Sequence, residues 1–393
     1  MSTESAVRVT ARLGFSRLDE VEPGVDARGL RRATTRPIDT PFDEQFALHT
    51  CELTDLCEDQ QDPPALLSAG FETINLSRDA ALQSLLGDVR RAGEITGEQA
   101  RALRRRLTGR VFRLRNGRCL KMLNIAPEGL ILRTGGPNGL SVDAARVMSE
   151  MNGHDVALAI HADQDVRGTP LKQLMKGRAP RLFRHQTPDG DNRLSPLMLT
   201  NVWIPLQQIT RPLAFMDRRS LDAKQHQLRY ALPTDTFLDR DEAQVNNDIW
   251  SFLHDPSQRW FFHSRMTHDR AYVFDTLGEP HGSFILPGEA RAEFFFLRLR
   301  ALHAALEKGN TTTLDATAPP ALPHDTPLPL RYAVGQMEQV AARCPPASAA
   351  QSVRRAWQAE ATAVMDPLVR RSLEMRVVSV VLPDVWPLNR GAQ

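Results

Sequence analysis

The sequence has few aromatic residues, few cysteines and no long apolar run. Aromatic residues make up 6% of the 393 positions, and the four cysteines are spaced like neither a zinc motif nor a disulfide framework. No apolar segment approaches the ~18 residues that a membrane-spanning helix needs, and the N-terminal segment lacks the apolar core of a secretory signal. We therefore expect a cytoplasmic protein with reduced thiols and no membrane association.

The sequence also lacks a strong charge of either sign. Its formal net charge is +2, so the whole molecule has no field that would attract nucleic acid or acidic membranes. Hydrophobic residues make up 41% and charged residues 24%, which is ordinary for a globular protein. A chain of this length can bury a sizeable core.

Short strands dominate the middle of the chain. Between 197 and 285 apolar segments alternate with turn signals and show little helical period, which favours a sandwich or barrel. We expect the strand at 197–206 to stop at Pro205 and another strand to cover 155–165. Further predicted elements are helices over 78–107 and 141–153 and a hairpin over 111–123 that turns at Asn116-Gly117.

The predicted organisation has three parts. Residues 1–65 form an N-terminal arm with strands packed on the core, and residues 66–287 with 369–388 form the core itself. Residues 288–368 form a mostly helical insertion, with helices near 289–309 and 348–366, before a Val-rich last strand. We expect these helices to supply packing surface or the contact of a homodimer, and the alternative that the sequence leaves open is a lid over the site.

His161-Ala-Asp163 is the first candidate site. Residues i and i+2 of a strand point to the same side, so an imidazole and a carboxylate at a strand end can share one metal ion. A second histidine completes a facial triad of the kind that binds non-haem Fe(II) and leaves positions open for O₂. Chance alone supplies about one such pair from 11 His and 47 acidic residues, so the pair gains weight only from its context. His281, between a turn and a strand, is the candidate second histidine.

The last strand carries the third candidate site. Arg370, Ser372, Glu374 and Arg376 share one face of it, and apolar residues share the other. An interior face of this kind suits a dicarboxylate, because the Arg fork matches a carboxylate bidentately and a Ser hydroxyl adds a donor. The alternative is a polar face that meets water. These motifs follow a particular order along the chain: His-x-Asp, several strands, a second His and then Arg-x-Ser. The same order is typical of a 2-oxoglutarate oxygenase barrel.

With these motifs the sequence resembles a known family, that of the cephamycin 7α-hydroxylase component and the fungal aspergillic-acid hydroxylase/desaturase. The likeness covers roughly a third of the chain. Five blocks carry it: IHADQ (160–164), NVWIPL (201–206), RPLAFMDRRSL (211–221), QRWFFHSRMTHDRAYVFDT with PHGSF (258–284), and RRSLEMRV (370–377).

The resemblance implies a double-stranded β-helix core, mainly β with flanking helices, and an Fe(II)- and 2-oxoglutarate-dependent dioxygenase that uses O₂. It implies hydroxylation or desaturation of a small natural-product or amino-acid-derived substrate, as in secondary-metabolite biosynthesis. The residues that it assigns are iron ligands His161, Asp163 and His281; 2-oxoglutarate binders Arg370 and Ser372, with Arg376 as a competitor; and pocket residues Asn201 and Trp203.

Two features leave other functions open. Ile204 stands where the family has an arginine, which leaves room for a metal-binding barrel with chemistry that does not use 2-oxoglutarate. Residues 101–118 contain eight arginines and no acid, a stripe that can neutralise phosphates or dock an acidic carrier protein. The alternative is that the stripe has no binding function and is a solvated helix followed by a hairpin edge. We expect no nucleic-acid binding.

Overall fold

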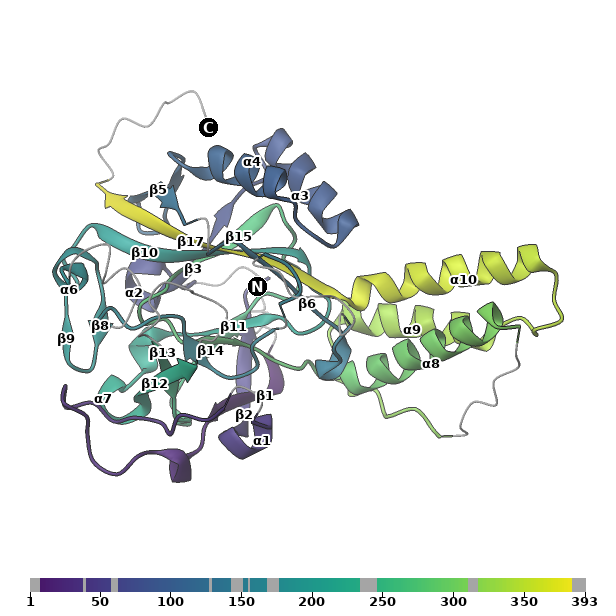
Figure 1. Cartoon of the computed structure of the whole chain (residues 1–393), viewed down its shortest axis with the longest axis horizontal. Coiled ribbons are helices and arrows are strands. Elements are labelled where there is room, and N and C mark those ends of the chain that lie inside the picture. Colours follow the sequence, from purple (N-terminus) through teal and green to yellow (C-terminus); the bar gives the residue numbers. More distant parts are fainter. Residues whose placement is uncertain are drawn as a thin grey trace, which may run out of the picture.

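The computed structural model describes residues 8–37, 40–57, 63–126, 129–142, 151–154, 156–167, 177–233, 246–309 and 317–383. Two largely antiparallel sheets face each other, with helices outside them (Figure 1). The first sheet has the order β1-β2-β14-β11-β16-β7-β13-β12, and the second has the order β3-β15-β10-β17-β5-β4 with β6 also paired to β17. The fold is a double-stranded β-helix, mainly β with flanking helices, as predicted.

The strands of the first sheet are β1 (Arg8–Ser16), β2 (Phe46–Asp55), β7 (His161–Ala162), β11 (Leu213–Met216), β12 (Gln227–Pro233), β13 (Asn246–Phe252), β14 (Trp260–Phe262) and β16 (His281–Ser283). Those of the second are β3 (Phe71–Asn75), β4 (Val111–Arg113), β5 (Cys119–Ile125), β6 (Ile131–Gly135), β10 (Leu197–Gln207), β15 (Arg270–Asp275) and β17 (Arg370–Leu382). A separate hairpin joins β8 (Gln186–Thr187) to β9 (Gly190–Asp191).

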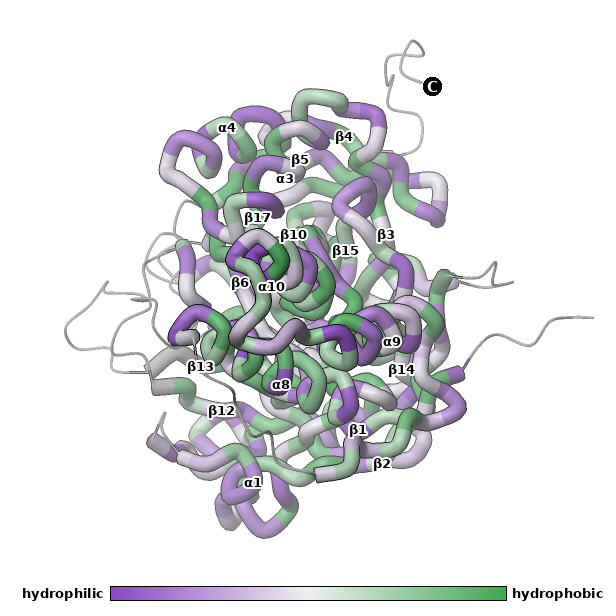
Figure 2. The backbone as a smooth tube through the Cα atoms, turned by 90° about the vertical axis from the view of Figure 1, so that its right-hand side faces the viewer, coloured by the Kyte–Doolittle hydropathy of each residue, from purple (hydrophilic) through white to green (hydrophobic). Residues whose placement is uncertain are grey.

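The longer helices are α3 (Ala80–Ala92), α4 (Gly97–Leu107), α8 (Glu289–Glu307), α9 (Leu328–Ala342) and α10 (Gln351–Met365). Single-turn helices are α1 (Phe42–Gln45), α2 (Leu66–Ala69), α6 (Ala179–Leu182) and α7 (Ala223–His226). Seen from the side, α3 and α4 lie at one end of the molecule and β1 and β2 at the other (Figure 2). Within the described residues, no helix combines the length and apolarity that crossing a bilayer requires.

Strand β10 shows how alternation divides the interior into layers. Val202 and Ile204 join the apolar cluster that includes buried side chains of α3 and α4. Trp203, between them, joins a second cluster with Phe215 of the opposite sheet. Because neighbouring residues of a strand point to opposite faces, one face of β10 is covered by helices and the other faces the first sheet. Ile204 therefore lies on the helix side of the sheet, away from the space between the sheets.

Strand β17 comes late in the sequence but lies in the middle of its sheet. It pairs with β10 along most of its length, with β6 at its start and with β5 at its end. Leu373, Met375 and Val377 are fully buried in the helix-side cluster. Arg370 and Ser372 are also buried, with 1% and 0% of their surface exposed, so the polar face at the start of this strand points into the protein and not into water.

Two predicted strands differ in extent from the observed ones. Strand β10 continues past Pro205 to Gln207, because the missing proline N–H is accommodated by a register shift between these residues against β17. The predicted strand at 155–165 is reduced to β7, His161–Ala162, since the chain changes partners there. Ile160 donates its N–H to Gly14 and Gln164 donates to Thr276, in different strands or loops.

The helical segment between β16 and β17 has three helices in place of the two expected. Helices α8 and α10 fall where the sequence predicts them, and α9 was not predicted. Together they project to one side of the β core (Figure 1). Predicted helix 141–153 lies mostly outside the described residues. The hairpin at Asn116-Gly117 is present between β4 and β5, with Gly117 at a φ of 81°.

Glu289, the first residue of α8, joins three segments of backbone. Its fully buried carboxylate accepts hydrogen bonds from the backbone N–H groups of Arg211 (2.7 Å), Leu286 (2.9 Å) and Asn138 (2.7 Å). Burial raises the pKa of Glu289 to about 7. Glu289→Ala should lower the free energy of unfolding by roughly 3 kcal/mol or more, because three backbone donors, two of them buried, lose their acceptor. Chemical denaturation measures this loss.

Glu293→Ala is the matched control for that measurement. Glu293 lies one turn further along α8, is partly exposed, and accepts one hydrogen bond from the side chain of Asn138 at 2.7 Å. We expect Glu293→Ala to cost about 1 kcal/mol or less. Equal losses in the two variants would show that the buried carboxylate of Glu289 has no special part in joining these segments.

Candidate metal centre

Three predicted ligands meet between the two sheets. Strands β7 and β16 are neighbours, and His161 lies opposite His281 in their register. The two rings have centroids 4.6 Å apart, and Asp163 follows β7 by one residue. Among the described residues, these three form the one group of His, Cys, Asp or Glu side chains placed to hold a metal ion, with one ligand atom from each within 4.8 Å of the others.

Each imidazole is held by a backbone carbonyl two residues before it in the chain. The Nδ1–H of His161 donates to the carbonyl of Ala159 at 2.8 Å, and the Nδ1–H of His281 donates to the carbonyl of Glu279 at 3.0 Å. In each ring the Nε2 nitrogen faces Asp163, whose Oδ1 lies 3.8 Å from His161 Nε2 and 3.9 Å from His281 Nε2. A hydrogen bond on the far nitrogen is how proteins orient a metal-binding histidine.

The carboxylate of Asp163 is oriented from the opposite sheet. Asn201 Nδ2, on β10, donates to Asp163 Oδ2 at 3.0 Å. This hydrogen bond leaves Oδ1 directed at the two histidines. The side chains of His161, Asp163 and His281 are 19%, 9% and 6% exposed, so the site is shielded from bulk water without being sealed.

Electrostatics favour the ligand forms of these groups. Burial, reinforced by the nearby His281, lowers the pKa of His161 to about 4. Burial acts to raise the pKa of Asp163, but His281, Arg376, His161 and the Asn201 hydrogen bond outweigh it and bring that pKa to about 2. At neutral pH the His161 imidazole is consequently neutral and the Asp163 carboxylate is ionised, as metal coordination requires.

Aromatic side chains enclose His281. The ring of Phe215, on β11, stacks on it at 5.8 Å between centroids, and the ring of Phe274, on β15, approaches to 4.5 Å. Both phenylalanines are buried. They lower the local dielectric and fix the ring without competing as ligands.

Arg370 crosses from one sheet to the other beside this centre. Its Nη1 donates to Ser283 Oγ of β16 at 2.7 Å, and its Nη2 donates to Ser372 Oγ at 3.3 Å. The guanidinium carbon also lies 5.4 Å from the centroid of the Trp203 ring. Ser283 follows His281 by two residues, so both side chains point into the same space. The structure thus brings Arg370, Ser372 and Trp203 together on the side of the centre that is nearest His281.

Arg376 lies further along β17. It is opposite Asn201 in the strand register, and its charge helps to keep Asp163 ionised. Arg376 is partly exposed, whereas Arg370 is 1% exposed. Arg376 therefore belongs to the Asp163 side of the centre, and Arg370 to the His281 side.

Sequence reasoning missed Ser283 and Asp165. Ser283 could have been found from the two-residue period that placed Asp163 beside His161, because it stands in the same relation to His281. Asp165 carries no local signal, since its buried carboxylate meets Arg28, which is far away in the sequence. Only the fold brings these two residues together.

The arginine stripe at 101–118 lies away from the centre. It covers α4 and the β4–β5 hairpin, on the helix side of the second sheet. Arg106 and Arg110 pair with Asp79 at 2.9 and 3.1 Å. The solvated helix and hairpin edge expected from the sequence are what the structure contains.

Asn201→Ala should weaken metal binding by about 10- to 100-fold, because a residue that orients a ligand typically contributes that much. Isothermal titration calorimetry with Mn²⁺ measures the change. Asn124→Ala, on the exposed part of β5, is the control and should leave the affinity unchanged. An unaltered Mn²⁺ affinity in Asn201→Ala would mean that the hydrogen bond from Asn201 does not orient the Asp163 carboxylate.

Comparisons with known proteins add the following. A family model described as an oxidoreductase/YMDC permease-like domain matches residues 152–286, about a third of the chain. No curated protein matches. A solved structure of the iron and alpha-ketoglutarate-dependent endoperoxidase NvfI aligns with a TM-score of 0.47 and 15% identity over 95% of this chain and 98% of that chain. A second structure of NvfI, in a different conformation, aligns with a TM-score of 0.46 and 14% identity, over 97% of this chain and 99% of that chain. The segment matched by the family model contains all three residues of the candidate metal centre.

Proposed function

We propose that this protein is an Fe(II)- and 2-oxoglutarate-dependent oxygenase. The observation that carries the proposal is the meeting of His161, Asp163 and His281 between the two sheets of a double-stranded β-helix. Two neutral imidazole nitrogens and one carboxylate oxygen form the donor set of non-haem Fe(II) oxygenases. The description of the matching family model as oxidoreductase-like agrees with this class.

The residues present fit a single metal ion. The Nε2 atoms of both histidines lie less than 4 Å from Asp163 Oδ1, and ions of this kind lie ~2.0–2.2 Å from nitrogen and oxygen ligands. Both far nitrogens and the second carboxylate oxygen are already engaged by hydrogen bonds. All three side chains are therefore oriented toward one point before any ion binds.

The residues around Arg370 fit the distal carboxylate of 2-oxoglutarate. Arg370 supplies a buried fork of donors, Ser372 and Ser283 supply hydroxyls beside it, and Ser283 lies two residues from the candidate ligand His281. The indole N–H of Trp203 is buried and has no hydrogen-bond acceptor among the described residues. A bound ligand atom would satisfy it. We assign Arg370 and Ser372 to the carboxylate, and Asn201 and Trp203 to the lining of the pocket.

When Fe(II) and 2-oxoglutarate are bound, they supply the oxidation of an unactivated C–H bond by O₂. The chain's own part is to place these groups. His161, Asp163 and His281 would hold the metal, Arg370 would fix the orientation of 2-oxoglutarate, and the aromatic side chains around His281 would exclude water from the reacting region. We further propose a small natural-product or amino-acid-derived substrate, oxidised by hydroxylation or desaturation in the cytoplasm.

The test is anaerobic reconstitution of the wild-type protein with Fe(II) and 2-oxoglutarate. We expect the weak visible charge-transfer absorption that accompanies chelation of protein-bound Fe(II) by 2-oxoglutarate. Folded, iron-loaded protein without this absorption would favour the alternative, a metal-binding barrel with different chemistry. A second assay measures DNA binding at increasing salt, and tight salt-dependent binding would favour the nucleic-acid alternative raised by the stripe at 101–118.

We also propose a domain organisation for the chain. Residues 66–287 and 369–388 form the oxygenase core, residues 1–65 pack against it, and residues 288–368 form an insertion. The insertion packs on the core and offers exposed apolar side chains, among them Leu328 and Tyr332 at 69% and 71% exposure. A homodimer contact is the use that this surface favours, and sedimentation analysis tests it.

A further inference from the structure

A loop near the N-terminus lies across the outer edge of the first sheet. The N–H of Ala33 donates to the carbonyl of Arg229 on β12, and the N–H of Arg229 donates to the carbonyl of Arg31, both at 3.0 Å. The segment just before this contact turns sharply, with Gly29 at a φ of 74°, a conformation that favours glycine. The loop is thus attached to the sheet by backbone hydrogen bonds, and its turn is directed toward the loop that follows β7.

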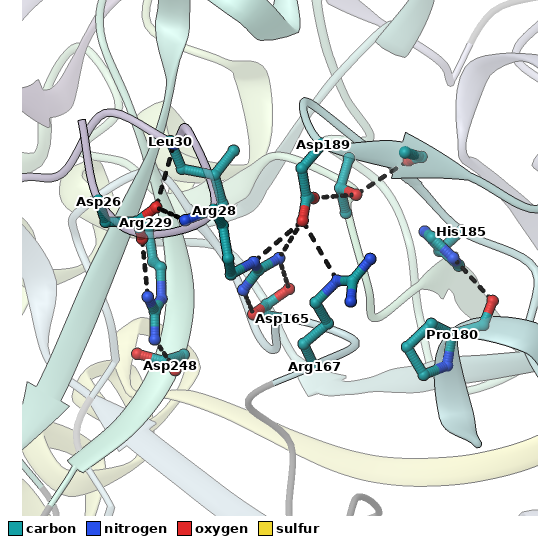
Figure 3. A network of polar contacts seen from close by, with 12 residues as sticks. Asp26, Arg28, Leu30, Asp165, Arg167, Pro180, His185, Asp189, Arg229 and Asp248 are labelled. Atoms are coloured by element: carbon teal, nitrogen blue, oxygen red, sulfur yellow. Dashed lines mark hydrogen bonds and ion pairs between the residues drawn. The ribbon is translucent and has the colours of Figure 1, made fainter. Parts of the chain in front are cut away.

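Asp26 fixes the shape of that turn. Its Oδ1 accepts hydrogen bonds from the N–H groups of Arg28 (2.8 Å) and Leu30 (3.1 Å), and its Oδ2 accepts one from Arg229 Nη1 at 2.7 Å. Arg229 in turn pairs with Asp248 on β13. The backbone on both sides of Arg28 is therefore held, which limits the directions open to the Arg28 side chain (Figure 3).

The Arg28 guanidinium joins two acidic residues from separate parts of the chain. It pairs with both carboxylate oxygens of Asp165 and with Asp189 Oδ2 at 2.9 Å (Figure 3). The side chain of Asp165 is 0% exposed, that of Asp189 is 10% exposed and that of Arg28 is 19% exposed. Asp189 belongs to the turn between β8 and β9, so one partly buried cation connects the N-terminal loop, the loop after β7 and this hairpin.

Asp165 lies two residues after the candidate ligand Asp163. Its backbone N–H donates to the carbonyl of Asp248 at 2.9 Å, and the N–H of Gln164 donates to the carbonyl of Thr276 at 3.2 Å. The backbone bonds restrain the loop from one side, and the Arg28 ion pair restrains it through the Asp165 side chain. The position of Asp163 relative to the two histidines depends on this short loop.

We propose that Arg28 is a positioning residue for the metal ligand Asp163, acting through Asp165. This inference rests on the proposed metal site. Without Arg28 the loop after β7 loses the ion pair that restrains it through the Asp165 side chain, and the Asp165 carboxylate is left buried without a counter-charge, which lowers the stability. The unrestrained loop then leaves its position, and Asp163 Oδ1 no longer holds its place near the two Nε2 atoms.

The test measures the affinity of the full-length protein for Mn²⁺, an ion that resists oxidation in air, by isothermal titration calorimetry. Arg28→Ala should weaken binding by about 10- to 100-fold, the usual effect of losing a group that supports a ligand. Arg167→Ala is the matched control. Arg167 Nε pairs with Asp189 at 3.2 Å in the same network, and its removal should leave the affinity unchanged. Absence of Mn²⁺ binding in the wild type would contradict the proposed function itself, which is a separate result.

A double variant separates positioning from stability. Arg28→Ala with Asp165→Asn removes the unpaired buried charge, so thermal unfolding should return toward the wild-type temperature while the Mn²⁺ affinity stays low. Recovery of the affinity together with the stability would overturn the proposal. If Arg28→Ala does not fold, Arg28→Lys tests the proposal in its place. Lysine keeps the charge but cannot bind two carboxylates with a planar fork. Folded Arg28→Lys should bind Mn²⁺ more weakly than wild type, and wild-type affinity would overturn the proposal.

Discussion

Replacing Asp163 by alanine should abolish turnover of 2-oxoglutarate, with a loss of at least about 1,000-fold. A residue that merely orients a ligand contributes about 10- to 100-fold to metal affinity, so the loss of the only carboxylate ligand of the triad must exceed that range. A 1,000-fold loss corresponds to about 4 kcal/mol. The measurement is release of CO₂ from labelled 2-oxoglutarate at saturating Fe(II), combined with a direct determination of bound iron.

The design of that experiment needs two comparisons. Asp163→Glu retains the carboxylate but moves it by one methylene, and we expect activity well below that of the wild type because Asn201 and the two histidines are placed for the shorter side chain. Exposed His324 provides the second comparison, since His324→Ala removes a histidine without touching the site. Iron content and activity near the wild-type values in Asp163→Ala would refute the assignment of the metal centre.

Replacing Arg370 by methionine should raise the KM for 2-oxoglutarate by about 100-fold or more while leaving the metal affinity nearly unchanged. Loss of one partner from a buried, hydrogen-bonded charge pair costs about 2–5 kcal/mol. Arg370 is buried among two serine hydroxyls and the Trp203 ring, on the side of the centre nearest His281. Steady-state kinetics over a range of 2-oxoglutarate concentrations gives the KM, and calorimetry with Mn²⁺ gives the metal affinity.

Arg376→Met distinguishes the two arginines on this strand face. Arg376 lies opposite Asn201 and keeps the pKa of Asp163 low. Its removal should therefore weaken metal binding and change the KM for 2-oxoglutarate only slightly. If Arg376→Met raised that KM and Arg370→Met did not, the roles of the two residues would have to be exchanged.

The strand-rich core and its chain order could be predicted because they depend on local patterns. Alternation along β17 and the spacing of His161 and Asp163 are consequences of the two-residue period of a strand. That period shows which residues share a face, but it does not show which face meets water. The pattern is therefore compatible with a buried or a solvent-exposed position of Arg370 and Ser372. The packing of the two sheets, which buries both residues, decides between them.

What could not be predicted depends on contacts between distant segments. The pairing of Arg28 with Asp165 joins residues 137 positions apart, and no periodicity encodes it. The reduction of the strand at 155–165 to two residues has the same origin, because the extended chain there exchanges hydrogen bonds among several strands. Ile204, a departure that cast doubt on 2-oxoglutarate, packs on the helix side of its sheet, a location that only the register of β10 reveals.

The central place of β17 bears on how the protein matures during synthesis. Ribosomes deliver the chain from its N-terminus at ~5–20 residues per second, so His161, Asp163 and His281 emerge well before Arg370. Until β17 arrives, β10 lacks one of its two neighbours in the sheet, and its exposed edge invites wrong pairing. Under the proposed function, the nascent chain therefore carries the three candidate metal ligands before it carries Arg370, the residue that we assign to the carboxylate of 2-oxoglutarate.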